Sequence, residues 1–496
     1  MRYRRFTFKL CFNTFALLLV LCALFAGLLD AGITGSQALK NRLQLFLKNP
    51  SLKNVSCGIS IVSVHKNVSL FTYRNNDLFS VASNMKLLTA SAALKCLGPD
   101  FEYKTSIIAR GKITTSGELR GDIVMKGSGD PNISGRFYQG NILAIPEAWA
   151  EATRRKGIQS ITGDIIADDR IFDRISTNPN WPENQLSEWY CAPSCGLSFN
   201  DNCVDITLVP DRKPGSLVKL LVEPRTSYFT INNSCVYTSK KKEHLYSIRR
   251  KPETNEISIK GKFWVNSAPE KAWVSVHNPA LYLATVFKET LEKNGIPVYG
   301  SVRLIDEGDF VSSEENVITE TTSTMEQTIQ VMNKQSQNFY AEQIMKTLGA
   351  QMKGRGTLEA GIEVVQDFMD EIGFQPEEYH IDDGCGLSKE NRLSPKMITA
   401  LLAYMSKQPH GKVLWDSLPI SGVDGGLRRR MHASKYKSKI RAKTGYIART
   451  SALSGYVDTT HGEVLAFSIL MNNFQNLTVV RKIQDDICQA IVDYYQ

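Results

Sequence analysis

The pattern of apolar and polar positions predicts similar elements at the two ends of the chain. Apolar residues recur at helical spacing in residues 37–48 and 83–97, and again on one face between Val480 and Tyr494. Short β-rich runs lie next to these helices, at residues 58–64, 69–74, 439–447, 453–458 and 463–471. We expect the two early and three late strands to form one antiparallel sheet flanked by helices, which is an α+β fold.

The middle of the chain, residues 99–319, has a different pattern. Strand-like runs separated by turns dominate it, at residues 121–125, 163–168, 204–209 and 217–222. We interpret this segment as a large β-rich insertion, with a further lobe at about 205–270. The residues on either side, 33–98 and 320–496, would then form one domain. A chain of 496 residues agrees with two or three domains in all.

The first residues form a separate segment. Basic side chains precede an apolar stretch at 15–29, which Asp30 ends; they are Arg2, Arg4, Arg5 and Lys9. A basic flank followed by a short apolar run is typical of an export signal, and a membrane span needs about 20 apolar residues. We therefore expect residues 1–32 to be a signal peptide or an uncleaved N-terminal anchor, and the protein to be periplasmic or elsewhere in the cell envelope.

Composition and charge exclude some classes of function. With 42% hydrophobic and 22% charged residues, the chain resembles an ordinary globular protein, and its net charge of +9 is moderate. The densest basic runs, 240–242 and 428–430, lack the interleaved aromatic residues of a single-stranded nucleic-acid groove. We expect no nucleic-acid partner, whereas the positive charge favours association with an anionic membrane surface or envelope polymer. The ten cysteines lack the paired spacing of a zinc site and no H-E-x-x-H is present, so we expect no metal and no other cofactor.

Three short motifs follow one another along the chain. They are Ser83-Asn84-Met85-Lys86, Ser336-Gln337-Asn338 and Lys443-Thr444-Gly445. In this order they match the S-x-x-K, S-x-N and K-T-G set of penicillin-recognising serine enzymes. K-T-G occurs once, but S-x-x-K also begins at Ser63, Ser216, Ser239 and Ser434. Only the copy at Ser83 opens an apolar helix that follows two strands, so we choose that copy.

The first motif places a hydroxyl beside an amine. Helical spacing puts Ser83 and Lys86 on one face. A serine at a helix start is most often an N-cap, and that is the structural alternative here. In the catalytic interpretation Lys86 accepts the serine proton, so its pKa of about 10.4 must fall by about 3 units, equivalent to about 4 kcal/mol. Burial together with a second cation such as Lys443 would lower it. The backbone amides of Ser83 and Tyr446 would form an oxyanion hole.

The second and third motifs would handle the substrate. The structural alternative for Ser336 and Asn338 is a polar loop at a helix entry. In the catalytic interpretation Ser336 relays a proton to the leaving amine and Asn338 holds the substrate amide. On a strand, Lys443 and Thr444 would bind a terminal carboxylate, and Gly445 would let the substrate backbone approach closely.

Longer strings carry a family resemblance. The relevant strings are 81–89, 197–203, 277–280, 383–388, 422–427 and 441–445. From about residue 40 to the C-terminus the chain resembles the D-alanyl-D-alanine carboxypeptidase/endopeptidase family, the class C low-molecular-mass penicillin-binding proteins. The resemblance implies a transpeptidase/β-lactamase-like domain with a large insertion, and an acyl-enzyme on Ser83. It also implies peptidoglycan stem peptides and crosslinks as substrates, and inhibition by β-lactams. The family usually has proline in place of Val81 and serine in place of Cys385; neither change removes a motif atom.

The resemblance also implies an aspartate of the insertion that contacts the free amino group of the diaminopimelate side chain. We expect this residue to be Asp168, with Asp169 as the next choice. The structural alternative is an acidic pair exposed to solvent in a turn.

Two other functions would use the same motifs. A β-lactamase shares the acylation residues but also needs an efficient deacylating water, for which we can assign no residue. A peptidoglycan-binding scaffold would keep the fold without turnover, but the presence of every motif residue argues against it.

Overall fold

The computed structural model describes residues 35, 37–66, 68–211, 213–306, 308–309 and 316–494. The predicted export signal, residues 1–32, lies outside the described residues. Within the described part of the chain, no helix combines the length and apolarity that a membrane crossing requires. The chain divides by its contacts into two compact units, which we describe separately.

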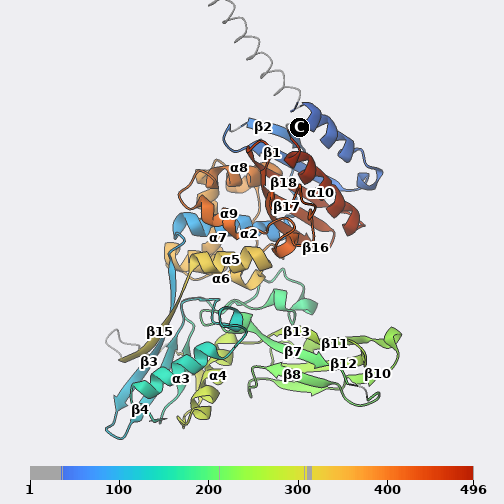
Figure 1. The fold of residues 1–496 in the computed structure, drawn as a ribbon. Helices are drawn as coiled ribbons and strands as arrows, with labels where there is room; N and C mark the ends of the chain where they lie inside the picture. Colours follow the sequence, from blue (N-terminus) through green and yellow to red (C-terminus); the bar gives the residue numbers. More distant parts are fainter. Residues whose placement is uncertain are drawn as a thin grey trace, which may run out of the picture. The chain divides into compact units, whose positions relative to one another are not determined.

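The first unit comprises residues up to Phe79 together with Ser394–Ser406 and Pro419–Gln496. It contains a five-stranded sheet in the order β16-β17-β18-β1-β2, with every neighbouring pair antiparallel (Figure 1). Its strands are β1 (Ser56–Ser63), β2 (Val68–Tyr73), β16 (Ile440–Ile447), β17 (Thr450–Asp458) and β18 (Val464–Asn472). The predicted sheet of two early and three late strands is therefore confirmed.

Helices cover this sheet. Residues 37–47 are helical, and the other α-helices among the described residues of this unit are α8 (Pro395–Met405) and α10 (Leu477–Val492). The first eight residues of β17 are all buried. Since successive side chains of a strand point to opposite faces, both faces of the sheet are covered at β17. Helix α10 packs on β17, and α8 packs on β17, β18 and β1.

The second unit comprises Ser80–Leu393 and Lys407–Leu418. Its helical part contains α2 (Met85–Cys96), α5 (Met325–Gln335), α6 (Asn338–Lys353), α7 (Leu358–Glu371) and α9 (Gly411–Ser417). Helix α2 contacts each of the other four. Every residue of α2 from Met85 to Leu94 is buried, so this helix is a central element and not an amphipathic surface helix.

A six-stranded sheet forms the next part of this unit, with the order β14-β6-β4-β3-β15 and β5 paired to β4. The strands are β3 (Glu102–Ile113), β4 (Glu118–Lys126), β5 (Ser160–Ile161), β6 (Ile165–Asp168), β14 (Val302–Leu304) and β15 (Asn316–Thr324). Helices α3 (Ala144–Arg155) and α4 (Pro279–Lys293) pack against each other, and the core lies between them and the sheet (Figure 1).

Two smaller sheets complete the unit. One has the order β13-β7-β8, with β7 (Cys203–Val209), β8 (Lys219–Glu223) and β13 (Glu270–Ser275). The other contains β9 (Thr230–Asn233), β10 (Val236–Thr238), β11 (Leu245–Arg250) and β12 (Glu256–Trp264). They share a hydrophobic core that includes Ile206 and Phe263. The contact-based division falls after Phe79 and after Leu393, so the boundaries predicted at 98 and 320 and the lobe at 205–270 remain predictions.

Candidate active site

Ser83 lies in a short 3-10 turn, Ala82–Asn84, directly before α2. The N-cap of α2 is Asn84, so the alternative in which Ser83 caps the helix is wrong. Ala82 has a φ of +45°, a conformation that costs a non-glycine residue free energy and recurs at functional sites. Gly386 approaches this turn so closely that a Cβ on it would lie 1.9 Å from the Ala82 carbonyl oxygen. The Gly386 backbone therefore packs directly against the turn that carries Ser83.

Lys86 is fully buried, and its amine lies within hydrogen-bond distance of three oxygen atoms. Nζ lies 3.0 Å from Ser83 Oγ, 2.7 Å from Asn338 Oδ1 and 2.7 Å from the carbonyl oxygen of Cys385. The amide and carbonyl oxygens can only accept hydrogen bonds, whereas the serine hydroxyl can also donate. An ammonium would donate to all three oxygens, whereas a neutral amine would donate to the two carbonyl-type oxygens and accept from the Ser83 hydroxyl. The arrangement therefore accommodates Lys86 in both protonation states.

Burial lowers the pKa of Lys86, while the neighbouring Cys385, Asp383 and Glu342 raise it. Removing a charged amine from water favours the neutral form, and this is the larger influence. The predicted lowering by burial is thus confirmed in direction. The part expected of Lys443 remains a prediction.

The second motif lies in the turn between α5 and α6. Ser336 ends α5 in the left-handed conformation, with φ +57°, and Asn338 is the first residue of α6. Asn338 accepts from Lys86 through Oδ1 and donates through Nδ2 to the carbonyl oxygen of Tyr190, at 2.8 Å. The structure therefore unites Ser83, Lys86 and Asn338, and both polar ends of the Asn338 amide have protein partners. The predicted contact of Asn338 with the substrate amide and the proton relay through Ser336 remain predictions.

The segment around Cys385 contributes groups that motif reasoning missed. Its carbonyl oxygen binds Lys86, and the Gly384 carbonyl accepts from Thr89 Oγ1 at 2.7 Å. The only indication in the sequence was the string 383–388. The Cys385 side chain is buried, and burial raises the pKa of its thiol far above the usual value, so it is not a reactive thiolate. All eight cysteines among the described residues are free thiols.

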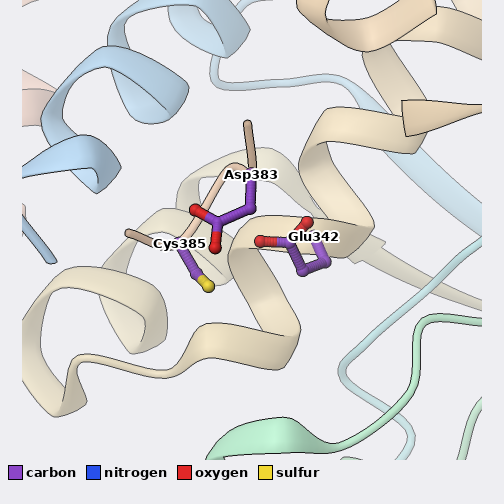
Figure 2. Close-up of side chains that lie close together, drawn as sticks. All are labelled: Glu342, Asp383 and Cys385. Atoms are coloured by element: carbon purple, nitrogen blue, oxygen red, sulfur yellow. The ribbon is translucent and has the colours of Figure 1, made fainter. Parts of the chain in front are cut away.

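Figure 2 shows the side chains of Glu342, Asp383 and Cys385 converging. One potential ligand atom from each lies within 4.8 Å of the others, the only such trio of metal-ligating side chains among the described residues. Asp383 already accepts four hydrogen bonds, from the Gly386 and Ser388 amides, Asn391 Nδ2 and Trp181 Nε1. Its lone pairs are thus engaged, and the trio lies next to the Lys86 amine. These residues fit a proton-exchanging cluster better than a metal site.

The third motif lies on β16 in the first unit. Lys443 is buried and donates to the carbonyl oxygen of Thr444 at 2.8 Å. Strand β16 is at the edge of its sheet, and Tyr446 near its end is 51% exposed. A Cβ on Gly426 would lie 2.3 Å from Thr444 Oγ1, so this glycine permits a close approach to the motif. The roles predicted for Lys443, Thr444, Gly445 and Tyr446 remain predictions.

Asp168 is the last residue of β6 and Asp169 follows it directly; both are buried. The Asp168 carboxylate accepts from Arg170 Nε and Nη2, each at 2.9 Å, and Asp169 pairs with Arg174 at 2.9 Å. The alternative of a solvent-exposed acidic pair is therefore wrong. Each carboxylate is neutralised within the chain.

Comparison with known proteins decides the family. The family model described as "D-Ala-D-Ala carboxypeptidase 3 (S13) family" matches residues 39–493, which is most of the chain. The chain belongs to this family. As a member of the S13 family it is a serine-type D-Ala-D-Ala carboxypeptidase, and hence a hydrolase.

Relatives of this S13 member agree with it over nearly its whole length. The D-alanyl-D-alanine carboxypeptidase of Actinomadura sp. (strain R39) is 28% identical, over 94% of this chain and 87% of that protein. The crystal structure of penicillin binding protein 4 from Haemophilus influenzae has a TM-score of 0.78 at 22% identity, covering 91% of this chain and 99% of that one. A second structure of that protein, in complex with a novel β-lactam, has a TM-score of 0.72 at 21% identity and the same coverage. The predicted α+β fold and family are confirmed.

Proposed function

We propose that this S13 member removes the terminal D-alanine from peptidoglycan stem peptides, and cleaves their crosslinks, through an acyl-enzyme on Ser83. The observation that carries the proposal is the 3.0 Å approach of Ser83 Oγ to Lys86 Nζ in a site where Lys86 is fully buried. A serine is a weak nucleophile until a neighbouring base takes its proton, and a buried neutral amine is such a base.

The first half of the reaction forms the ester. Lys86 takes the proton of the Ser83 hydroxyl while Oγ attacks the carbonyl carbon of the penultimate D-alanine. The tetrahedral oxyanion is stabilised by the backbone amides of Ser83 and Tyr446. The C–N bond then breaks, and the departing amine receives its proton through Ser336.

The second half releases the peptide. A water molecule loses a proton to Lys86 and attacks the ester, which frees the shortened peptide and restores the Ser83 hydroxyl. Asn338 holds Lys86 in position through Oδ1 at 2.7 Å.

For substrate recognition we propose two groups of residues. Lys443 and Thr444 bind the terminal carboxylate by charge and hydroxyl, and Gly445 leaves room for the peptide backbone. The edge position of β16 supports this role, because an extended peptide can align with an edge strand. Asp168, buried at the end of β6, receives the free amino group of the stem peptide in competition with Arg170.

Location and inhibition follow from the same proposal. The basic and apolar N-terminal residues support export to the periplasm or cell envelope, where peptidoglycan lies. β-Lactams would acylate Ser83 as substrate analogues, and the complex of the Haemophilus influenzae protein with a β-lactam supports this.

The proposal is tested by the mass of the intact protein after incubation with penicillin, followed by peptide mapping. We expect one slowly decaying adduct, located on Ser83 and lost in Ser83→Ala. Ser239→Ala, which alters another S-x-x-K copy, is the matched control and should label normally. An adduct that persists on another serine would overturn the assignment. Fast penicillin turnover would favour a β-lactamase, and a folded protein without adduct would favour a scaffold.

A further inference from the structure

Glu342 lies beside the catalytic lysine without belonging to any of the three motifs. It follows Asn338 by four residues in α6, and residues at this spacing share one face of a helix. It therefore faces the same region as the Asn338 oxygen that binds Lys86. Glu342 is 5% exposed, and its Oε1 has no hydrogen-bond partner.

The groups that face Glu342 are acidic except for Lys86. Asp383 and Cys385 each place a potential ligand atom within 4.8 Å of a Glu342 carboxylate oxygen (Figure 2). Two carboxylates at this separation do not both ionise readily in a buried site. Asp383 has four hydrogen-bond donors around it, whereas Glu342 has an oxygen without any. The proton is therefore held more easily by Glu342.

Electrostatics agree with this geometry. Burial first, and then the charge of Asp383, raise the pKa of Glu342 from 4.5 to about 8. Hydrogen bonds from Cys385 and the charge of Lys86 lower this pKa by smaller amounts. Burial also lowers the pKa of Lys86. Both shifts favour the uncharged form of their group near neutral pH.

We propose that Glu342 is a positioning residue that holds, as a carboxylic acid, the proton that Lys86 must lose to act as a base. The exchange is balanced: the ammonium nitrogen loses one proton, the carboxylate gains it, no electrons move and the net charge of the cluster is unchanged. An ion pair here would bury two charges, whereas the amine and the acid bury none. In addition, the N–H groups of Lys86 point to Asn338 Oδ1 and the Cys385 carbonyl and not to Glu342. This inference rests on the role proposed above for Lys86.

Infrared spectroscopy of the full chain tests the protonation directly. We expect the wild type at pH 7 to show the carbonyl stretch of a buried protonated carboxyl group, and to lose it as the pH rises through about 8. Glu342→Gln should lack this band. The control Glu359→Gln alters an exposed glutamate of the neighbouring α7 and should keep it. A wild-type protein without a carboxyl band that titrates in this range would overturn the proposal, and that measurement needs no variant.

The pH dependence of penicillin acylation gives a second readout. Glutamine resembles a protonated glutamate in shape and charge, so Glu342→Gln should keep the acidic limb of the wild-type profile in place. If Glu342 were ionised when Lys86 acts, its replacement would lower the Lys86 pKa and move the limb to lower pH by about one unit or more, which would contradict the proposal. If Glu342 only filled space, Glu342→Gln would change the acylation rate by the same factor at every pH, and the wild type would show no carboxyl band. Failure of penicillin to label the wild type would refute the proposed function without removing the infrared band.

Discussion

At the scale of single residues, the hydrogen-bonding capacity of Lys86 explains how a lysine serves as a base. Two of its neighbours, Asn338 Oδ1 and the Cys385 carbonyl, can only accept, whereas the Ser83 hydroxyl can also donate. Once Lys86 is neutral, its lone pair can therefore accept the Ser83 proton. We expect Lys86→Gln to lower the rate constant for penicillin acylation by about 10²- to 10⁴-fold, the usual contribution of a general base. Lys95→Gln, at an exposed position of the same helix, should leave the rate unchanged. Stopped-flow or quenched-label kinetics would measure both.

The protonation of Lys86 also predicts how activity depends on pH. The base form of Lys86 is required, and burial lowers its pKa. The acylation rate should therefore be constant above the Lys86 pKa and fall as the pH decreases through it. A rate that rises toward acid pH would show that Lys86 is not the base.

Glu342 connects this site to stability. Its pKa of about 8 in the folded state exceeds the value of 4.5 expected when unfolded. Between these values the folded state keeps a proton that the unfolded state releases, so this group's contribution to stability is present below pH 4.5 and is lost as the pH rises toward 8. Glu342→Gln should thus equal the wild type in free energy of unfolding at pH 4 and exceed it by about 3 kcal/mol at pH 7. Urea unfolding at several pH values measures this difference. If the free energy of unfolding changed with pH in the same way for both proteins, the prediction would be contradicted.

At the scale of elements, the turn before α2 depends on the loop that carries Cys385. Gly386 has a φ of +81° and leaves no room for a Cβ beside Ala82. We expect Gly386→Ala to displace this turn, to slow penicillin acylation and to cost about 3 kcal/mol of stability. Gly373→Ala is the matched control, since its φ of +93° is equally unusual but nothing lies within 4 Å of the added Cβ. It should cost only about 1–2 kcal/mol and leave acylation unchanged. Equal effects of the two variants would show that the loss of stability and of acylation rate comes from the backbone conformation and not from the contact with Ala82.

At the scale of the whole molecule, the three motifs are distributed over both compact units. Ser83 and Ser336 belong to one unit, and Lys443 belongs to the other. Because Lys443 is proposed to bind the substrate carboxylate and not to activate the nucleophile, Lys443→Ala should mainly raise KM for a D-alanyl-D-alanine peptide. Lys437→Ala, at an exposed position near the start of β16, should leave KM unchanged. A KM like that of the wild type in Lys443→Ala would remove this residue from substrate binding.

Local pattern alone determined much about this protein. The periodicity of apolar residues predicted the five strands of the antiparallel sheet and the buried helix at which the first motif lies. It could do so because side-chain spacing within one element reflects which faces are buried. The position of Ser83 at the start of an apolar helix distinguished it from four other S-x-x-K copies. The family followed from the strings around these motifs.

Only the tertiary structure decided the environment of the reacting groups. The Lys86 amine meets partners 252 and 299 residues away in sequence, at Asn338 and Cys385. Glu342 is an ordinary helical residue in the sequence and becomes a proton-holding candidate only beside Asp383 and a buried amine. Asp168 was expected to bind a ligand amino group, with exposure in a turn as the alternative; the structure shows it buried and paired with Arg170, so the exposed alternative is wrong and the ligand role remains a prediction. The pKa of a group depends on its burial and on the charges around it, and both are set by packing between distant segments, which local periodicity does not encode.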